Sequence, residues 1–359
     1  MKRNTFIIVA ILASGMLLWN CTDRDRSGFG STLEESLNRS SERLDNAIGE
    51  ITATPGYQVL SLGESGSLKS TAADSVEYLD SITLNEISGI YEFENPDTLP
   101  HCHHCFYNLF KKTGESDQLV VSLPESKVFH PFQLHNMMQS DTSLANNFTI
   151  TASDYHYYYA RGLMYDYKLL AGFELDSTNI GSLDLASAST SYFDFTYHSA
   201  FTFNDNYSIR LDQISGDTST FSFALLDGTE TLLSESVNTI KTGASRHFER
   251  SYQLNIGNVE ILKTSESDSI QIFLNGVLQQ NAVVEFINVS TDNGEGRALC
   301  RGNRDIQITF DDGTVTTLSA LIGPSLETLD NLAGSLQNMY FASYVVDYIA
   351  WNIYTGRIS

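Results

Sequence analysis

Basic residues are scarce in this 359-residue chain, which has 21 Lys and Arg against 44 Asp and Glu and a net charge of −23. A protein this acidic repels polyanions, so nucleic acid and anionic lipid surfaces are not expected partners. Enzyme signatures are missing too, because the sequence contains no G-x-S-x-G, G-x-G-x-x-G, Walker or H-E-x-x-H motif. Their absence favours a non-catalytic role, without excluding carboxylate pairs that meet only in space.

The N-terminal apolar run, residues 6–18, falls short of the roughly 20 residues that a transmembrane helix needs. Lys2 and Arg3 precede it, and Cys21 follows it closely. A short basic segment before a short apolar run is typical of a secretory signal peptide.

This stretch resembles bacterial lipoprotein signals, in which the cysteine behind the apolar run receives a diacylglycerol and further acyl chains such as palmitate. The resemblance implies lipidation at Cys21. Leu18 fits the aliphatic position of that motif, whereas Trp19 and Asn20 stand where small residues are usual. An ordinary signal peptide with a chance cysteine, or an uncleaved anchor, is the alternative.

The lipoprotein interpretation divides the chain into a signal peptide (1–20), a polar tether (21–30) and a folded body (31–359), with a possible sub-boundary near residue 145. It places the protein in the cell envelope, anchored to the outer membrane and either periplasmic or surface-exposed. Three cysteines remain in the body, Cys102, Cys105 and Cys300. Disulfides persist in such a compartment, so one pair and one leftover thiol is the simplest arrangement.

Two helices are expected, one at each end of the body. Apolar residues recur at helical spacing in residues 31–53, where Thr32 and Glu35 form a capping box and Pro55-Gly56 is expected to end the helix. A second pattern of this kind runs over residues 324–354, from Pro324 to just before Gly356, and is apolar on most sides. Part of the second segment could instead be a strand.

Between these segments, from Tyr57 onward, the period of the pattern is two, with Val, Ile, Tyr, Phe and Thr between short polar turns. Asp227-Gly228, Asn275-Gly276 and Asp312-Gly313 predict tight hairpins. The expected fold is α+β. Its main part is an antiparallel sheet, either curved or a sandwich, on which an N-terminal helix and a long apolar C-terminal helix pack.

The segments 89–124 and 201–237 have a strand-and-turn texture similar to that of exported lipoproteins of the Bacteroidetes group, which are β-rich and of uncharacterised function. The resemblance covers about half of the chain. It implies an exported β-rich protein, and it brings no catalytic motif to transfer.

His101, Cys102, His103, His104 and Cys105 form the densest cluster of metal-ligand residues in the sequence. Thiolates and imidazoles bind zinc, so a zinc ion at Cys102 and Cys105 is one possibility. No second pair of Cys or His residues follows at the spacing that zinc fingers have. A local disulfide, free thiols and a redox role are the alternatives, and no other cofactor is expected.

Tyr155, Tyr157 and Tyr159 would share one face of a strand. An exposed row of aromatic rings can stack on sugar rings, so these residues are candidates for ligand binding. Tyrosine is also a common strand residue that covers a half-buried sheet.

The function expected from the sequence is that of a lipid-anchored envelope protein with a binding or structural role, whose ligand is a glycan, a peptide or a protein. One alternative is a carrier that holds an amphiphile in a cavity between the sheet and the C-terminal helix. The other is a hydrolase that acts on polysaccharide.

Overall fold

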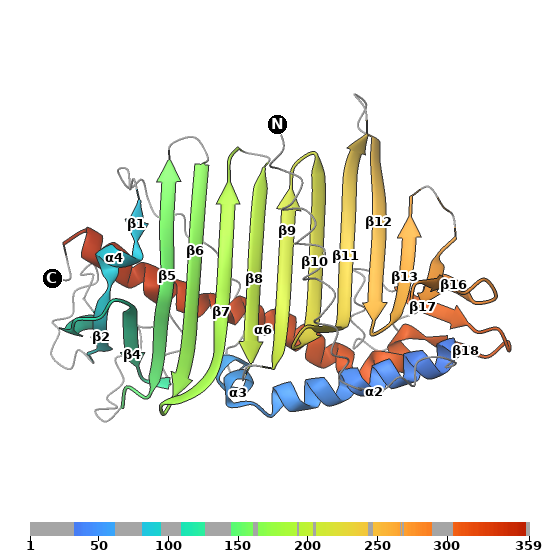
Figure 1. Ribbon diagram of the computed structural model, residues 1–359, viewed down its shortest axis with the longest axis horizontal. Helices are drawn as coiled ribbons and strands as arrows, with labels where there is room; N and C mark the ends of the chain where they lie inside the picture. Colours follow the sequence, from blue (N-terminus) through green and yellow to red (C-terminus); the bar gives the residue numbers. More distant parts are fainter. Residues whose placement is uncertain are drawn as a thin grey trace, which may run out of the picture.

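The computed structural model describes residues 32–61, 81–94, 109–125, 145–160, 164–191, 194–203, 206–242, 247–265, 267, 269–288 and 304–356. A sheet of fifteen strands dominates it, with helices on one side (Figure 1). The prediction of a mainly antiparallel β-sheet with an N-terminal helix is confirmed.

The strands of this sheet are β1 (Ile82–Thr83), β2 (Gly89–Phe93), β3 (Phe110–Gly114), β4 (Leu119–Leu123), β5 (Phe148–Ala160), β6 (Met164–Leu175), β7 (Thr178–Ser189), β8 (Phe195–Phe203), β9 (Tyr207–Ser215), β10 (Thr218–Asp227), β11 (Glu230–Thr242), β12 (His247–Ile256), β13 (Val259–Thr264), β14 (Gln271–Leu274) and β15 (Val277–Leu278). From β4 to β15 each strand pairs antiparallel with the next along the chain. β4 and β5, on either side of residue 145, therefore lie in the same sheet.

One edge of the sheet departs from the antiparallel pattern. β2 lies between β3 and β4 and runs parallel to β4, because the chain passes from β2 to the edge strand β3 before it returns. The antiparallel part of the sheet is regular because its hairpin turns contain residues that adopt positive φ. Gly228 and Gly313 have φ values of 58° and 84°, and Asn275-Gly276 has both residues at positive φ. All three predicted hairpins are therefore present.

The N-terminal helix α2 (Leu33–Thr52) starts with the predicted capping box, in which Glu35 N donates to Thr32 Oγ1 and Thr32 N donates to the Glu35 carboxylate. Residues 55–61 correct the sequence analysis, because they form a short helix, α3 (Pro55–Ser61), where strand was expected from Tyr57. The reason is local: proline is favoured at the first position of a helix, and the Thr54 hydroxyl accepts a hydrogen bond from Tyr57 N.

The C-terminal segment forms helix α6 (Leu318–Tyr354), and α4 (Leu84–Ile87) is a single turn beside β1. The start of α6 was predicted at Pro324 and lies six residues earlier. Thr317 is its N-cap, and its hydroxyl accepts from Ala320 N. Figure 1 shows α6 crossing behind the strands at a slant, with α2 along their lower ends.

A small antiparallel sheet, β16 (Val283–Asn288), β17 (Arg304–Thr309) and β18 (Val315–Thr317), stands at the start of α6. Polar contacts join α2 to the rest of the body. Arg43 donates two hydrogen bonds, of 2.6 and 2.8 Å, to the Glu230 carboxylate, and the Tyr207 hydroxyl donates to Glu50 at 2.6 Å. Ser325 on α6 donates to Asp45 on α2.

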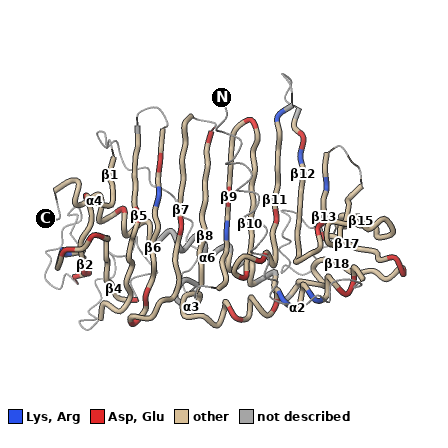
Figure 2. The backbone as a smooth tube through the Cα atoms, in the orientation of Figure 1, with Lys and Arg blue, Asp and Glu red and all other residues tan. Residues whose placement is uncertain are grey.

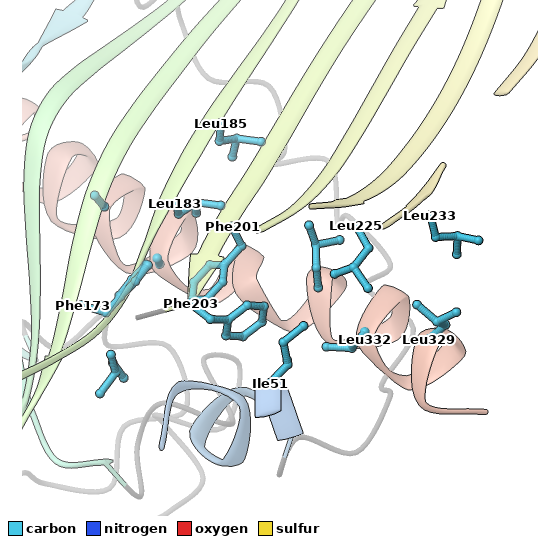
Figure 3. Packing of buried hydrophobic residues seen from close by; sticks show 14 of the residues in the cluster. Ile51, Phe173, Leu183, Leu185, Phe201, Phe203, Leu225, Leu233, Leu329 and Leu332 are labelled. Atoms are coloured by element: carbon cyan, nitrogen blue, oxygen red, sulfur yellow. The ribbon is translucent and has the colours of Figure 1, made fainter. Parts of the chain in front are cut away.

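The core lies between the sheet and the helices. Residues opposite one another on neighbouring strands share a face, so Phe201, Ile209, Leu225, Leu233 and Ile256 form one row across β8–β12. Each of them is at most 1% exposed. Figure 3 shows Leu329 and Leu332 of α6 and Ile51 of α2 beside Phe203 and Leu225. This face is called the covered face below, and the opposite one the open face.

Candidate functional site

The predicted tyrosine row lies on the covered face, at the paired strands β5 and β6. Its exposure rises along the strand: Tyr155 is 3% exposed, Tyr157 is partly buried and Tyr159 is 50% exposed. Ligand binding by the three tyrosines stays a prediction, whereas the burial of Tyr155 fits the alternative of a half-buried sheet. The cause of this burial is helix α6, which reaches the lower end of the row, whereas Tyr159 lies at the hairpin end of β5.

Asp347 of α6 meets this row. Its Oδ1 accepts hydrogen bonds from the hydroxyls of Tyr155, at 2.9 Å, and of Tyr167, at 3.2 Å. The rings of Tyr155 and Tyr167 meet edge to face with centroids 5.9 Å apart, and Tyr165 stacks on Tyr167. Strands β5 and β6 are thus joined to α6 by hydrogen bonds to the Asp347 carboxyl group, which lies among tyrosine rings.

The surroundings control the ionisation of Asp347. Burial raises the pKa of its carboxyl from 3.8 to about 7, while the hydrogen bonds from Tyr155 and Tyr167 act in the opposite direction. Burial also raises the pKa of the Tyr167 hydroxyl well above its usual value, so this hydroxyl stays a donor. The cluster can therefore hold a proton on a carboxyl group near neutral pH. Perturbed carboxyl groups occur both at functional sites and in structural networks.

The open face is the second candidate site, and in Figure 1 no described element lies on it. The strand register gives its central row, which crosses β6 to β12 and consists of Lys168, Ala186, His198, Asp212, Ser222, Ser236 and Gln253. The row on one side holds Asp166, Ala188, Thr196, Ile214, Thr220, Asn238 and Ser251, and the row on the other holds Leu170, Asp184, Ala200, Arg210, Ala224, Ser234 and Asn255. Short hydroxyl, amide and methyl side chains make up most of this surface.

Charged groups gather near its centre. His198 Nδ1 lies 2.6 Å from Asp212 Oδ1, and Arg210 Nε donates to Asp212 Oδ2 at 2.6 Å. Burial opposes ionisation of Asp212, but the hydrogen bonds from His198 and Arg210 outweigh it and lower the carboxyl pKa. The result is a fixed anion between two donors, surrounded by small polar side chains.

Asn255 Nδ2 donates to Ser234 Oγ at 2.9 Å, and Gln253 Nε2 donates to Glu260 Oε1 at 3.0 Å, both on the open face. These contacts join side chains on neighbouring strands and fix their orientation. The surface can therefore form several hydrogen bonds to one extended polar ligand.

The other predicted site residues lie outside the described part of the chain: Cys21, His101, Cys102, His103, His104, Cys105 and the third body cysteine, Cys300. Lipidation, zinc binding and disulfide pairing at these positions stay predictions. Within the described residues, no three His, Cys, Asp or Glu side chains come together as metal ligands. None of the described helices is long and apolar enough to cross a membrane.

Sequence reasoning missed the Asp347 contact and the open face. The signal for Asp347 was a single acid among Tyr344, Val345, Tyr348 and Ile349, since an acid in an apolar helix needs a partner. The signal for the open face was the alternation of large apolar residues with Ser, Thr and Ala in β7–β11. Recognising one continuous surface also requires the register of each strand pair, which the sequence does not state.

Fold and site together define a mainly antiparallel β protein with one covered and one open sheet face. Comparison of the chain with protein-family models, with curated proteins and with solved structures finds no match.

Proposed function

We propose that this protein is a lipid-anchored cell-envelope protein without catalytic activity, whose open sheet face binds an extended polar polymer such as a glycan. The observation that carries the proposal is the continuous surface of three rows across β6–β12, most of whose side chains are short hydroxyl, amide and methyl groups. From β5 to β14 this face spans nine strand spacings of about 4.8 Å, about 43 Å in all. Such a width suits a polymer better than a single sugar.

Several features support a binding role for this face. Leu170 and Ile214 are the large apolar side chains in the three rows, and none of the rows contains Phe, Tyr or Trp. The surface is thus neither a core face awaiting an apolar cover nor an aromatic platform. In this proposal the apolar helix α6 packs on the sheet as the cover of the other face, and the tether behind Cys21 presents the body away from the membrane.

The lipid anchor has its own test. We expect the membrane-extracted protein to begin at Cys21 and to carry a diacylglycerol and an amide-linked acyl chain, which intact-mass spectrometry measures directly. A Cys21→Ser variant should lose this added mass. An unmodified chain that starts elsewhere would contradict the anchor while leaving the open face unaffected.

Bulky side chains on the open face should abolish binding. We expect the double variant Ser222→Tyr, Ser236→Tyr to bind an envelope glycan panel at least tenfold more weakly than the unaltered protein, because two neighbouring rings would hold the ligand off the flat row. Circular dichroism checks that the sheet is intact. A tyrosine at the exposed turn residue, in Thr229→Tyr, is the control and should have no effect.

Tyr159→Ala separates this proposal from the tyrosine row predicted from the sequence. Tyr159 is 50% exposed on the covered face, on the opposite side of the sheet from Ser222 and Ser236. We expect unchanged glycan binding in this variant. Loss of binding in Tyr159→Ala, with full binding in the double variant, would transfer the site to the tyrosines.

A further inference from the structure

A second surface lies on the covered face, where the upper ends of β9–β12 extend beyond α6 (Figure 1). The register places Phe221, Val237 and Tyr252 in one row, with Leu211 and Phe223 in the row beneath. These five residues are called the upper apolar patch. Below them comes the fully buried row that contains Leu225.

Solvent exposure of the side chains rises from the row of Leu225 to the upper apolar patch. The row of Leu225 and Leu233 is at most 1% exposed, whereas Phe223, Val237 and Tyr252 are partly exposed and Phe221 is 40% exposed. The apolar face therefore continues beyond the helices that cover its lower part. Exposed contiguous apolar surface of this kind marks a binding site more often than scattered exposed residues do.

The ionisation of Glu235 indicates that the patch is partly shielded from water. It lies beside Phe223 and Leu254 in the register, and burial raises the pKa of its carboxyl although Tyr252 donates a hydrogen bond to it. Water is thus partly excluded before any ligand is present.

Three basic residues border the patch on the same face. Lys263 pairs with Tyr252, Arg250 with Thr239, and Lys241 with Phe248, so the three form a diagonal from β13 to β11. Figure 2 shows them as blue segments on three successive strands. In the described part of the chain none of them forms an ion pair, and Lys263 Nζ donates to the Ser267 carbonyl at 2.6 Å.

This cluster is unusual in a protein with 44 acidic and 21 basic residues. The net charge of −23 opposes binding to an anionic membrane, where many charges act together. A single anionic group that reaches Lys241 and Arg250 meets a local excess of positive charge, because screening limits the effect of distant charges to about 10 Å.

We propose that the upper apolar patch binds a free long-chain carboxylate, with its chain along the row of Phe221, Val237 and Tyr252 and its carboxylate at Arg250, which lies between Lys241 and Lys263 in the register. The patch spans the three strand spacings from β9 to β12, about 14 Å. The occupant has to be both apolar and anionic, since the patch is apolar and its border is basic.

The test is a calorimetric titration of the full chain carrying Cys21→Ser, which prevents its own acyl chains from occupying the surface. The probe is sodium laurate below its micelle-forming concentration. We expect one laurate per chain, and at least tenfold weaker binding of dodecyltrimethylammonium, which has the same tail length and a cationic head. Equal affinity for the two probes would overturn the proposal.

Variants locate the site. The double variant Lys241→Gln, Arg250→Gln should weaken laurate binding at least tenfold, and Phe221→Ser at least fivefold. Lys111→Gln and Val315→Ser make matched changes at exposed positions elsewhere and should leave the affinity unchanged. Circular dichroism verifies the fold of each variant. Laurate binding that none of the patch variants alters would place the ligand elsewhere and refute the assignment.

A second copy of the chain is the competing occupant. Sedimentation equilibrium should show a monomer both with and without laurate. A dimer that dissociates in Phe221→Ser, together with no laurate binding, would show that a second copy covers the patch. Glycan binding by the open face should be the same in Phe221→Ser, so failure of either proposal is visible independently of the other.

Discussion

Replacing Asp347 with asparagine is expected to stabilise the protein at pH 7 and above and to leave its stability nearly unchanged at pH 4. The carboxyl pKa is about 7 in the folded chain, against an ordinary value of 3.8. The folded state therefore binds this proton more tightly than the unfolded state does. The stability that comes from the neutral carboxyl is complete below about pH 4 and is lost as the pH rises through 7.

The size of the effect follows from the two pKa values. A difference of about 3 pH units corresponds to a loss of at most about 4 kcal/mol in the unfolding free energy of the unaltered protein at pH 9. Asparagine keeps an acceptor oxygen for the hydroxyls of Tyr155 and Tyr167 and carries no charge. Urea unfolding at pH 4, 7 and 9 should show this difference growing between pH 4 and pH 7 and levelling off above pH 7.

Asp166→Asn is the control, because Asp166 lies on the same strand as Tyr167 and is exposed on the other face. We expect it to change the unfolding free energy by less than about 0.5 kcal/mol at every pH. A pH-independent difference between Asp347→Asn and the unaltered protein would show that Asp347 ionises freely. The account of the helix–sheet contact would then be wrong.

Phe203→Ala should be the most destabilising single truncation of the core. Phe203 is 1% exposed, meets Phe201 edge to face at a centroid distance of 4.7 Å, and lies beside Ile51 in Figure 3. Its removal leaves a cavity where β8, α2 and α6 meet, so we expect a loss of about 3–5 kcal/mol in urea unfolding.

Phe221→Ala is the matched control for this truncation. It removes the same side chain two strands away, at a position that is 40% exposed, and should lower the unfolding free energy by only about 1 kcal/mol. Equal losses in the two variants would contradict the arrangement in which the helices cover the row of Phe201 and leave the row of Phe221 partly uncovered.

Local signals in the sequence predicted much of the fold. Thr32 and Glu35 marked the start of α2, and Asn275-Gly276 marked a hairpin, because capping boxes and type I′ turns depend on a few neighbouring residues. Pro55 was harder to interpret, since proline both ends a helix and starts the next one. The parallel pair of β2 and β4 depends on contacts distant in sequence, which no local pattern encodes.

The candidate sites were less predictable than the fold. The sequence put Tyr155, Tyr157 and Tyr159 on one face of a strand, but whether α6 covers that face depends on tertiary packing. The same holds for His198 and Asp212, fourteen residues apart, which become neighbours only through the register of β8 and β9. Sequence patterns identify the strands, and the register decides which side chains act together.

The most direct test of the open face as a binding surface is carboxyl footprinting with a water-soluble carbodiimide, with and without the glycan that binds best. We expect the ligand to protect Asp166, Asp184 and Glu260 on the open face and to leave Glu34 and Glu42 on α2 equally labelled. Protection of the α2 carboxylates, with unchanged labelling of the three on the open face, would contradict the proposal.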